Sequence, residues 1–448
     1  CGLRGPARNI ITKEVDFQMK KYLALLLVLV MVLSLAACAS KTEPETTTEP
    51  ETTTETAPET TEEPAAEEPA AEEETPAEEP AADAAYSVAM ITDYGDITDQ
   101  SFNQTTYEAC KAYCEANGVD FNYYKPSGDS TAERVAMIEK AVEEGYTVIV
   151  MPGYAFGGAI KEAQDTYPDV KFVALDVSEY DITSEFYKKD ASGNATDELL
   201  SADKQPHVSK NVYSAVYKEE LCGYMAGYAA VKMGYKSLGF LGGMAVPAVQ
   251  RYGYGFVQGV DAAAKEMGLS DVKVNYVYGG QFSGDADITA AMDTWYKGGT
   301  EVVFACGGGI YSSAAEAAQK VGAKVIGVDV DQAGIIDSKY GDKMTVTSAM
   351  KGLAPTVKTM LTEIMAGNWD KYAGKVETLG LVSGDDPTLN YVQLPMDTTQ
   401  WTDSFTQDNY KSLVKDMFDG KITVSNDITK SAADFATVIT VDDQGKIK

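Results

Sequence analysis

The sequence predicts an α/β protein of two hinge-linked lobes, each a parallel sheet flanked by helices, with a cleft between the lobes. Three observations carry this prediction. From Tyr86 onward, short apolar runs typical of buried strands alternate with amphipathic stretches typical of helices, as in parallel βαβ units. The alternation begins again near Asn211. In both halves, acidic residues or glycines follow the strands, at the edge of an open α/β sheet where ligands bind.

The N-terminal segment has the pattern of an export signal. A signal that starts at Met19 has two lysines, an apolar run of roughly a dozen residues and then Leu35-Ala-Ala-Cys38. The last four residues resemble the bacterial lipobox. We therefore expect an upstream extension over residues 1–18, a lipoprotein signal peptide over residues 19–37, and a lipid on Cys38 that anchors the protein at the extracellular face of the cell membrane.

Glutamate, threonine, proline and alanine make up almost all of residues 41–85. Such a stretch has no apolar face to bury, its carboxylates repel one another, and its prolines interrupt helix and sheet. We expect residues 38–85 to form a disordered acidic tether behind the lipidated cysteine. The formal net charge of the whole chain is −31, which argues against nucleic acid as a partner.

The first lobe, expected over residues 86–208, is organised around Ile91 to Gln104. The strand that ends at Thr92 leads into a loop with three aspartates and then into a helix that reaches about Asn117. Residues 180–208 lack a period and are expected to be an inserted loop. Apolar patterns predict the other elements of this lobe, which are strands at Asp120–Lys125, Thr147–Met151 and Lys171–Asp176, and helices near Ser130–Glu144 and Phe156–Tyr167.

The second lobe, expected over residues 209–448 with a C-terminal capping segment, repeats this pattern. A last short strand is expected at Gly420–Val424. The predicted strands before it are Asn211–Tyr217, Ser237–Leu241, Lys273–Tyr278, Val302–Ala305, Lys324–Val328 and Met344–Ser348. The predicted helices lie near Lys218–Met233, Pro247–Met267, Ala286–Lys297, Tyr311–Val321, Leu353–Ala366 and Asp408–Phe418.

The residues available for catalysis argue against an enzyme. His207 is the one histidine of the chain and falls in the irregular insertion, so no histidine-based triad or histidine-rich metal site can be built on a rigid element. Cys110 and Cys114 lie on one predicted helix, but without a second pair they indicate buried apolar cysteines rather than a zinc site. Gly307-Gly-Gly309 is a weak phosphate signal, and more simply lets backbone approach a ligand. We expect no catalytic residue, metal or cofactor.

Aromatic residues near the predicted strand ends are a second group of candidates. They are Phe102, Tyr154, Phe156, Tyr252 and Phe256. A flat ligand such as a nucleobase needs an aromatic face on each side, and each stacked base contributes about 1–3 kcal/mol. Phe102 from the first lobe and Tyr252 from the second are the candidates for these two faces, although any single aromatic is more often part of a hydrophobic core.

Several motifs resemble the basic membrane protein family of substrate-binding lipoproteins, which includes purine nucleoside receptors of ABC transporters. In chain order they are ITD...DQSFNQ, FVALD, YKEELCGYMAG, GFLGGM..P..QRYGYGF, CGGG and VIGVDVDQ with SAMK downstream, and the resemblance covers roughly Tyr86 to Pro395. The resemblance implies a type I periplasmic-binding-protein-like fold. It also implies that a purine stacks between aromatic side chains of the two lobes while acidic residues hold the ribose hydroxyls and the base edge.

In the first lobe, the resemblance implies four ligand-binding residues. Asp93 would contact polar atoms of the ligand, Phe102 would give one stacking face, and Asn103 would hydrogen-bond the ligand. Asp176 would contact it from the end of the fourth strand.

In the second lobe, Tyr252 stands where the family usually has a second stacking aromatic, commonly Phe. Gly307 would bring backbone amides to the ligand, together with the next two glycines. Asp329 would take sugar hydroxyls, and Lys351 would complete the polar ring. The substitution of Tyr for Phe keeps the aromatic face and adds a hydroxyl.

These inferences predict an extracellular, lipid-anchored receptor that captures a nucleoside, most of all a purine nucleoside, by lobe closure and presents it to an ABC permease. Alternatives that keep the fold bind riboflavin, a sugar or a signalling molecule, for uptake or for sensing. A nucleoside hydrolase would instead use Asp93, Asp176 and Asp329 as catalytic carboxylates. A surface adhesin that uses the acidic tether would bind no small molecule.

Overall fold

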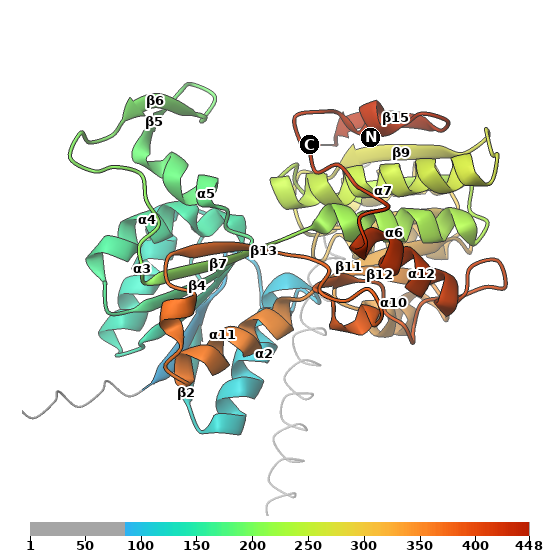
Figure 1. The fold of residues 1–448 in the computed structure, drawn as a ribbon. Coiled ribbons are helices and arrows are strands. Elements are labelled where there is room, and N and C mark those ends of the chain that lie inside the picture. The colour runs from blue at the N-terminus through green and yellow to red at the C-terminus, as the bar shows by residue number, and fades with distance from the viewer. Residues whose placement is uncertain (1–85, 448) are drawn as a thin grey trace, which may run out of the picture. The chain divides into compact units, whose positions relative to one another are not determined.

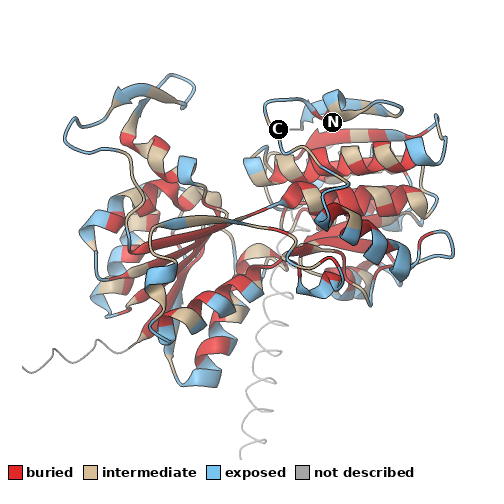
Figure 2. Ribbon diagram, viewed as in Figure 1, coloured by how far each residue is buried: buried red, intermediate tan, exposed pale blue. Residues whose placement is uncertain are grey.

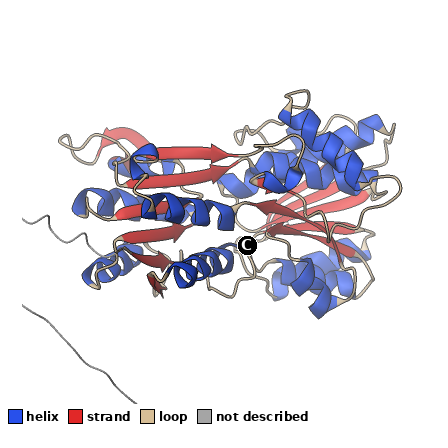
Figure 3. Ribbon diagram, turned by 60° about the horizontal axis from the view of Figure 1, so that its bottom comes forward, coloured by secondary structure: helices blue, strands red, loops and turns tan. Residues whose placement is uncertain are grey.

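The computed structural model describes residues 86–447, which form two large sheets flanked by helices and one two-stranded sheet (Figure 1). The expected upstream extension, signal peptide, Cys38 and tether lie outside the described residues. Neighbouring strands of both sheets are parallel except at one edge pair, and helices cover the sheets (Figure 3). The predicted α/β architecture of two lobes is confirmed.

The first lobe is built on a six-stranded parallel sheet with the strand order β13-β7-β4-β3-β1-β2. Its strands are β1 (Ser87–Ile91), β2 (Asp120–Tyr124), β3 (Val148–Pro152), β4 (Lys171–Leu175), β7 (Val212–Tyr217) and β13 (Lys375–Leu379). Its helices are α2 (Phe102–Asn117), α3 (Thr131–Glu143), α4 (Gly157–Thr166), α5 (Glu179–Thr183) and α11 (Leu353–Met365).

Alternate residues of each strand enter the cores on the two faces of this sheet. Val88 and Met90 of β1 cluster with Cys110 and Cys114 of α2, whereas the intervening Ala89 belongs to the cluster formed with α3 and α4. Every residue of β1 and of β3 is buried, as expected for parallel strands covered on both faces. Both cysteines are free and buried, in agreement with the sequence interpretation.

The second lobe is built on a seven-stranded sheet with the order β14-β12-β11-β10-β8-β9-β15. Only β14 runs antiparallel to its neighbour. The strands are β8 (Ser237–Gly242), β9 (Lys273–Tyr278), β10 (Val302–Cys306), β11 (Lys324–Asp329), β12 (Thr345–Lys351), β14 (Val392–Gln393) and β15 (Thr440–Lys446). The helices are α6 (Glu219–Lys232), α7 (Pro247–Glu266), α8 (Ala286–Lys297), α9 (Tyr311–Gln319), α10 (Ala333–Tyr340) and α12 (Gln407–Phe418).

Three segments cross between the lobes, and they correct the expected lobe boundary at residue 208. β7, which we expected to open the second lobe, pairs with β4 and β13 in the first sheet. The chain then enters the second lobe at α6, returns after β12 to α11 and β13, and crosses a third time before β14 (Figure 1). Pairing between strands far apart in sequence decides lobe membership, and local periodicity carries no signal for it.

The insertion contains more structure than the expected irregular loop. After α5, an antiparallel hairpin of β5 (Tyr187–Lys189) and β6 (Ala195–Leu199) projects from the first lobe (Figure 1). Most of its residues are exposed or partly exposed (Figure 2), so the hairpin has no buried face to leave an alternating apolar pattern in the sequence.

The expected last strand at Gly420–Val424 is wrong, because β15 forms instead and lies parallel to β9. Asp261 of α7 explains this placement. Its carboxylate accepts hydrogen bonds from the backbone N–H groups of Thr437 and Val438, at 2.7 and 2.8 Å. These bonds hold the segment before β15 beside β9.

α6 and α7 pack at very short range, and glycines make this possible. A Cβ atom at Gly223 would lie 2.1 Å from the carbonyl oxygen of Tyr252, and one at Gly259 would lie 2.1 Å from that of Tyr224. The close approach fixes the N-terminal ends of both helices next to each other. These ends carry Glu219 and Arg251, which belong to the cleft described below.

Candidate functional site

A cavity of about 570 Å³ lies at the carboxyl ends of the strands, between the two lobes. Loops that follow β1, β3 and β4 line it from the first lobe, and loops that follow β8, β9 and β10 line it from the second. All the ligand-binding residues predicted from the sequence line this cavity: Asp93, Phe102, Asn103, Asp176, Tyr252, Gly307, Asp329 and Lys351. The structure therefore brings the predicted set together, and the role of each residue toward a ligand stays a prediction.

The loop after β1 is held rigid by its own carboxylates. Asp93 Oδ1 accepts hydrogen bonds from the backbone N–H groups of Tyr94 and Gly95, at 2.6 and 2.7 Å. The Asn103 amide Nδ2 donates to Asp93 Oδ1 at 3.2 Å and to Asp99 Oδ2 at 3.1 Å. These bonds fix which way the amide faces, and they leave Asn103 Oδ1 buried without a protein partner. The loop thus contains a buried acceptor without a protein partner, on a residue that lines the cavity.

The ammonium group of Lys351 lies at the centre of the site, between carboxylates from both lobes. Asp176 of the first lobe accepts a short hydrogen bond from Lys351 Nζ. In the second lobe, Glu219 Oε1 lies 3.4 Å and Asp329 Oδ1 lies 3.7 Å from the same nitrogen. The Lys351 side chain is only 3% exposed. A buried ammonium is tolerated because these charges replace its lost hydration.

The charges around Lys351 determine the protonation of the site. Burial by itself would lower the pKa of Lys351, but the carboxylates of Asp176, Asp329 and Glu219 outweigh it and raise that pKa. Burial raises the pKa of Asp176 to about 6, against the opposing effect of the Lys351 ammonium. The Lys351 side chain is therefore a fixed positive charge, and burial leaves Asp176 with a pKa above that of an ordinary aspartate.

Asp176 and Asp329 occupy equivalent positions in the two lobes. Each ends or directly follows a strand, and their φ angles are 60° and 63°. Aspartate tolerates this left-handed region better than most residues, yet such a conformation is uncommon and is found at functional sites. It turns both carboxylates toward the cleft. Asp176 Oδ1 is buried without a hydrogen-bond partner, so a second unused acceptor is present there.

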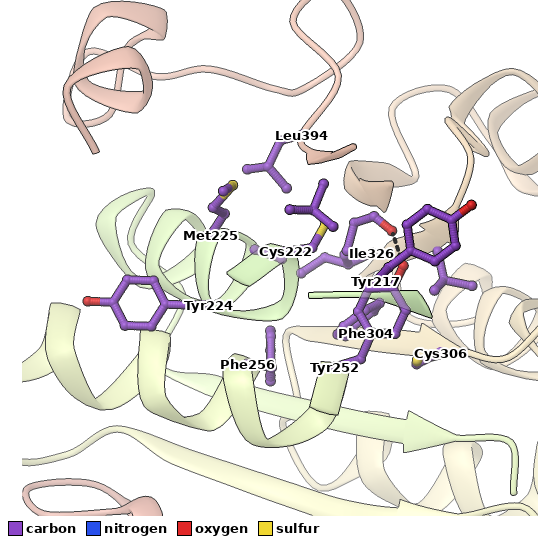
Figure 4. Close-up of a cluster of buried hydrophobic side chains, with 14 of the residues drawn as sticks. Tyr217, Cys222, Tyr224, Met225, Tyr252, Phe256, Phe304, Cys306, Ile326 and Leu394 are labelled. Atoms are coloured by element: carbon purple, nitrogen blue, oxygen red, sulfur yellow. Dashed lines mark hydrogen bonds between the residues drawn. The ribbon is translucent and has the colours of Figure 1, made fainter. Parts of the chain in front are cut away.

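Tyr252 is more deeply buried than a stacking residue is expected to be. Its side chain is 1% exposed, and its ring packs edge-on against Phe304 with centroids 5.8 Å apart (Figure 4). Its hydroxyl lies 3.4 Å from Asp329 Oδ1 and 3.3 Å from the carbonyl oxygen of Ala349. Tyr252 thus joins the hydrophobic core to the base of the cleft. Phe156 and Phe256, which were also candidates for stacking, are fully buried.

Phe282 is an aromatic residue of the cavity that sequence reasoning missed. It follows β9, is partly buried, and lines the cavity. A Cβ atom at Gly243 would lie 2.4 Å from its ring, and one at Gly307 would lie 2.9 Å from it. The two glycines therefore make the space in which the Phe282 ring lies, and Gly307, with φ of 155°, also has a backbone conformation that favours glycine.

Sequence reasoning also missed a buried ion pair at the start of α6 and α7. Glu219 is fully buried and accepts a hydrogen bond from Arg251 Nε at 2.7 Å, while its other oxygen faces Lys351. Arg251 lines the cavity as well. In the sequence, only the pair of glutamates after β7 could have indicated this ion pair. Acidic residues in the first turn of a helix are so common that they do not indicate a site.

The described residues contain no group of histidine, cysteine, aspartate and glutamate side chains suited to a metal ion. His207 lies outside the cavity, where its Nε2 is 3.0 Å from Asp165 Oδ1. Within residues 86–447, no helix combines the length and apolar character that crossing a membrane requires.

Residues 86–385 match the family model described as Bmp, ABC transporter substrate-binding protein PnrA-like. The chain is 27% identical to the ABC transporter nucleoside-binding protein BmpA of Lactococcus lactis, over 75% of this chain and 88% of that protein. It is 26% identical to basic membrane protein B of Borreliella burgdorferi, over 66% of this chain and 79% of that protein.

Solved structures agree with the fold. A solute-binding protein of an ABC transporter system from Aeropyrum pernix has a TM-score of 0.54 at 20% identity, over 78% of this chain and 90% of that one. A corresponding protein from Conexibacter woesei has a TM-score of 0.54 at 21% identity, over 76% of this chain and 99% of that one. These likenesses confirm the periplasmic-binding-protein-like fold predicted from the sequence.

Lys351→Met is expected to destabilise the protein by about 3–5 kcal/mol at pH 7, because it leaves buried carboxylates without their cation. Loss of the cation raises the native-state pKa of Asp176 further above its unfolded value of about 3.9. A carboxyl with a raised native pKa lowers stability above that pKa, and this cost disappears as the pH falls toward 4. The deficit, measured by urea unfolding, should therefore shrink between pH 7 and pH 5.

Lys125→Met is the matched control. Lys125 pairs with Asp96 at 2.8 Å, but both side chains are about half exposed, so its loss should cost no more than about 1 kcal/mol. Equal destabilisation by the two substitutions, or a Lys351→Met deficit that does not change with pH, would contradict the assigned charge network.

Proposed function

Because the chain belongs to the family of PnrA-like ABC transporter substrate-binding proteins, we propose that it captures a nucleoside, most of all a purine nucleoside, and presents it to an ABC permease. One observation carries this proposal. Two residues that line the cavity between the lobes, Asp176 and Asn103, each have a buried acceptor oxygen without a protein partner, and aromatic rings line the same cavity. A ligand that fits has hydrogen-bond donors on one part and a flat face on another, as a nucleoside does.

The charged part of the cleft suits a sugar. Carboxylates accept hydrogen bonds from vicinal hydroxyl groups, and the Lys351 ammonium donates to a hydroxyl or ring oxygen. Asp329 already accepts a hydrogen bond from a hydroxyl, that of Ser101 at 2.6 Å. A ligand that lacks one hydroxyl would leave a buried acceptor unpaired, which favours ribose over deoxyribose.

The aromatic part of the cleft suits a base. Phe102 of the first lobe lies with its ring centroid 4.8 Å from Lys351 Nζ and gives one stacking face, as predicted from the sequence. We assign the opposite face to Phe282 rather than to Tyr252, because the Tyr252 ring is committed to the core and its hydroxyl to Asp329. In this assignment, Tyr252 positions Asp329 through its hydroxyl group and does not stack on the base.

The cellular setting follows from the relatives and from the N-terminal motif. Several relatives are named as lipoproteins, and Leu35-Ala-Ala-Cys38 has the lipobox pattern. We propose that a lipid on Cys38 anchors the receptor at the extracellular face of the membrane, next to its permease. Lobe closure around the nucleoside would produce the state that the permease recognises.

A thermal-shift screen of the purified full chain tests the ligand. Nucleosides, free bases, riboflavin and common sugars are each added, and a ligand at one hundred times its dissociation constant should add about 2.7 kcal/mol of stability. Purine nucleosides are expected to raise the melting temperature most. A rise with riboflavin or a sugar but with no nucleoside would contradict the proposal that the ligand is a nucleoside. No rise with any of these compounds would contradict the receptor function.

Phe282→Ala is expected to weaken purine nucleoside binding by about 1–3 kcal/mol, because it removes one stacking face. Calorimetry with the best nucleoside of the screen measures the effect. Phe418→Ala is the matched control, since Phe418 is an exposed phenylalanine of α12 and its loss should leave the affinity unchanged. Unaltered affinity in Phe282→Ala would contradict this assignment and would favour Tyr252 as the second stacking residue.

A further inference from the structure

Two hydrogen bonds join the lobes directly beside the cavity. Gln332 Nε2 donates to the backbone carbonyl oxygen of Gln100 at 3.0 Å, and Ser101 Oγ donates to Asp329 Oδ2 at 2.6 Å. Gln100 and Ser101 precede α2 of the first lobe, whereas Asp329 and Gln332 precede α10 of the second (Figure 1). Gln100 and Gln332 are not among the residues that line the cavity, so their bond needs no ligand.

The second lobe alone fixes how the Gln332 side chain faces. Its Oε1 accepts a hydrogen bond from the backbone N–H of Val328 at 3.0 Å, and its own backbone N–H donates to Ser348 Oγ at 3.1 Å. Gln332 is fully buried. Because its amide oxygen must face Val328, its NH₂ group must face the first lobe. The donor is therefore in place before the lobes meet.

The first lobe holds the acceptor equally firmly. Gln100 has a φ angle of 58°, a left-handed conformation that is unfavourable in a residue with a side chain. Its backbone N–H donates to Gln104 Oε1 at 3.0 Å, and the next backbone N–H, that of Ser101, donates to Asp99 Oδ1 at 2.9 Å. The two bonds hold this conformation, in which the Gln100 carbonyl oxygen meets the second lobe.

We infer that Gln332 is a positioning residue for lobe closure, which acts on the Gln100 carbonyl and never touches the ligand. The bond exists only when the lobes are closed, so it raises the fraction of molecules that are closed without ligand. The apparent affinity of any ligand for the closed form scales with this fraction. Gln332 thus sets affinity for all ligands of the cleft by the same factor, whereas Asp329 and Phe282 set which ligand binds.

The inference about closure stands without the ligand, and its consequence for affinity rests on the proposed function. Gln332→Glu separates the two bonds of this side chain. The carboxylate keeps an oxygen for the Val328 N–H but has no donor for the Gln100 carbonyl, and it places negative charge against that oxygen. Gln332→Met is the second variant, with similar length, no donor and no charge.

The closed fraction is measured by energy transfer between two dyes attached through an unnatural amino acid in the full chain. Positions 111 and 320 are suitable, because Lys111 of α2 and Lys320 after α9 are exposed and belong to different lobes. Without ligand, both Gln332 variants are expected to show a smaller closed population than the native chain. Equal populations would overturn the inference.

Nucleoside binding gives the second readout. Loss of one neutral hydrogen bond is expected to weaken binding about three- to tenfold, by the same factor for guanosine, adenosine and cytidine, through faster dissociation. A loss confined to one nucleoside would overturn the inference, because Gln332 would then contact the ligand. If no nucleoside binds the native chain, the proposed function fails, while the ligand-free populations still decide the role of Gln332.

Gln407→Glu is the matched control. Gln407 also donates through Nε2 to a backbone carbonyl oxygen, that of Met396 at 2.9 Å, but this bond lies within the second lobe and is exposed. Its loss should change neither the closed population nor the affinity. A change as large as that of Gln332→Glu would show that any lost glutamine bond has this effect, and would overturn the assigned role.

Discussion

The buried ammonium of Lys351 is the interaction on which the rest of the cleft depends. Lys351 is the last residue of β12, immediately before the chain crosses to the first lobe, and Glu219 is the first residue of α6, immediately after an earlier crossing. The ion pair at 3.4 Å between them therefore ties two crossing segments together. A charge this deeply buried requires opposite charges close by, and one of them, Asp176, comes from the other lobe. The network is complete only when the lobes are close.

A second contact between the lobes lies beside this charged network and outside the cavity. Asp176, Asp329 and Lys351 line the cavity, and Asp176 Oδ1 is buried without a protein partner. Gln332 and the Gln100 carbonyl meet outside the cavity and contribute to closure alone. Such a division allows the affinity for all ligands to change without a change in specificity. It also explains why Gln100 keeps an unfavourable backbone conformation: that conformation aims an acceptor at the second lobe.

The sequence predicted most strands, because runs such as Ser87–Ile91 are apolar throughout, and it predicted the carboxylates at their ends. The family resemblance then named residues that all line one cavity. Two kinds of feature were missed. Lobe membership of β7 and β13 depends on strand pairing over long sequence separations. The burial of Tyr252 and the exposure of Phe282 to the cavity depend on how α7 packs and on the space left by Gly243 and Gly307, which no local pattern records.

The measurement that tests the central claim most directly is calorimetric titration of the full chain with guanosine, 2′-deoxyguanosine and 3′-deoxyguanosine. If carboxylates at the base of the cleft hold the ribose hydroxyls, guanosine binds one site per chain, and each missing hydroxyl weakens binding by about 1–3 kcal/mol, the cost of an unpaired buried acceptor. Equal affinities for the three compounds would contradict this account, because the charged centre of the cleft would then play no part in recognising the sugar.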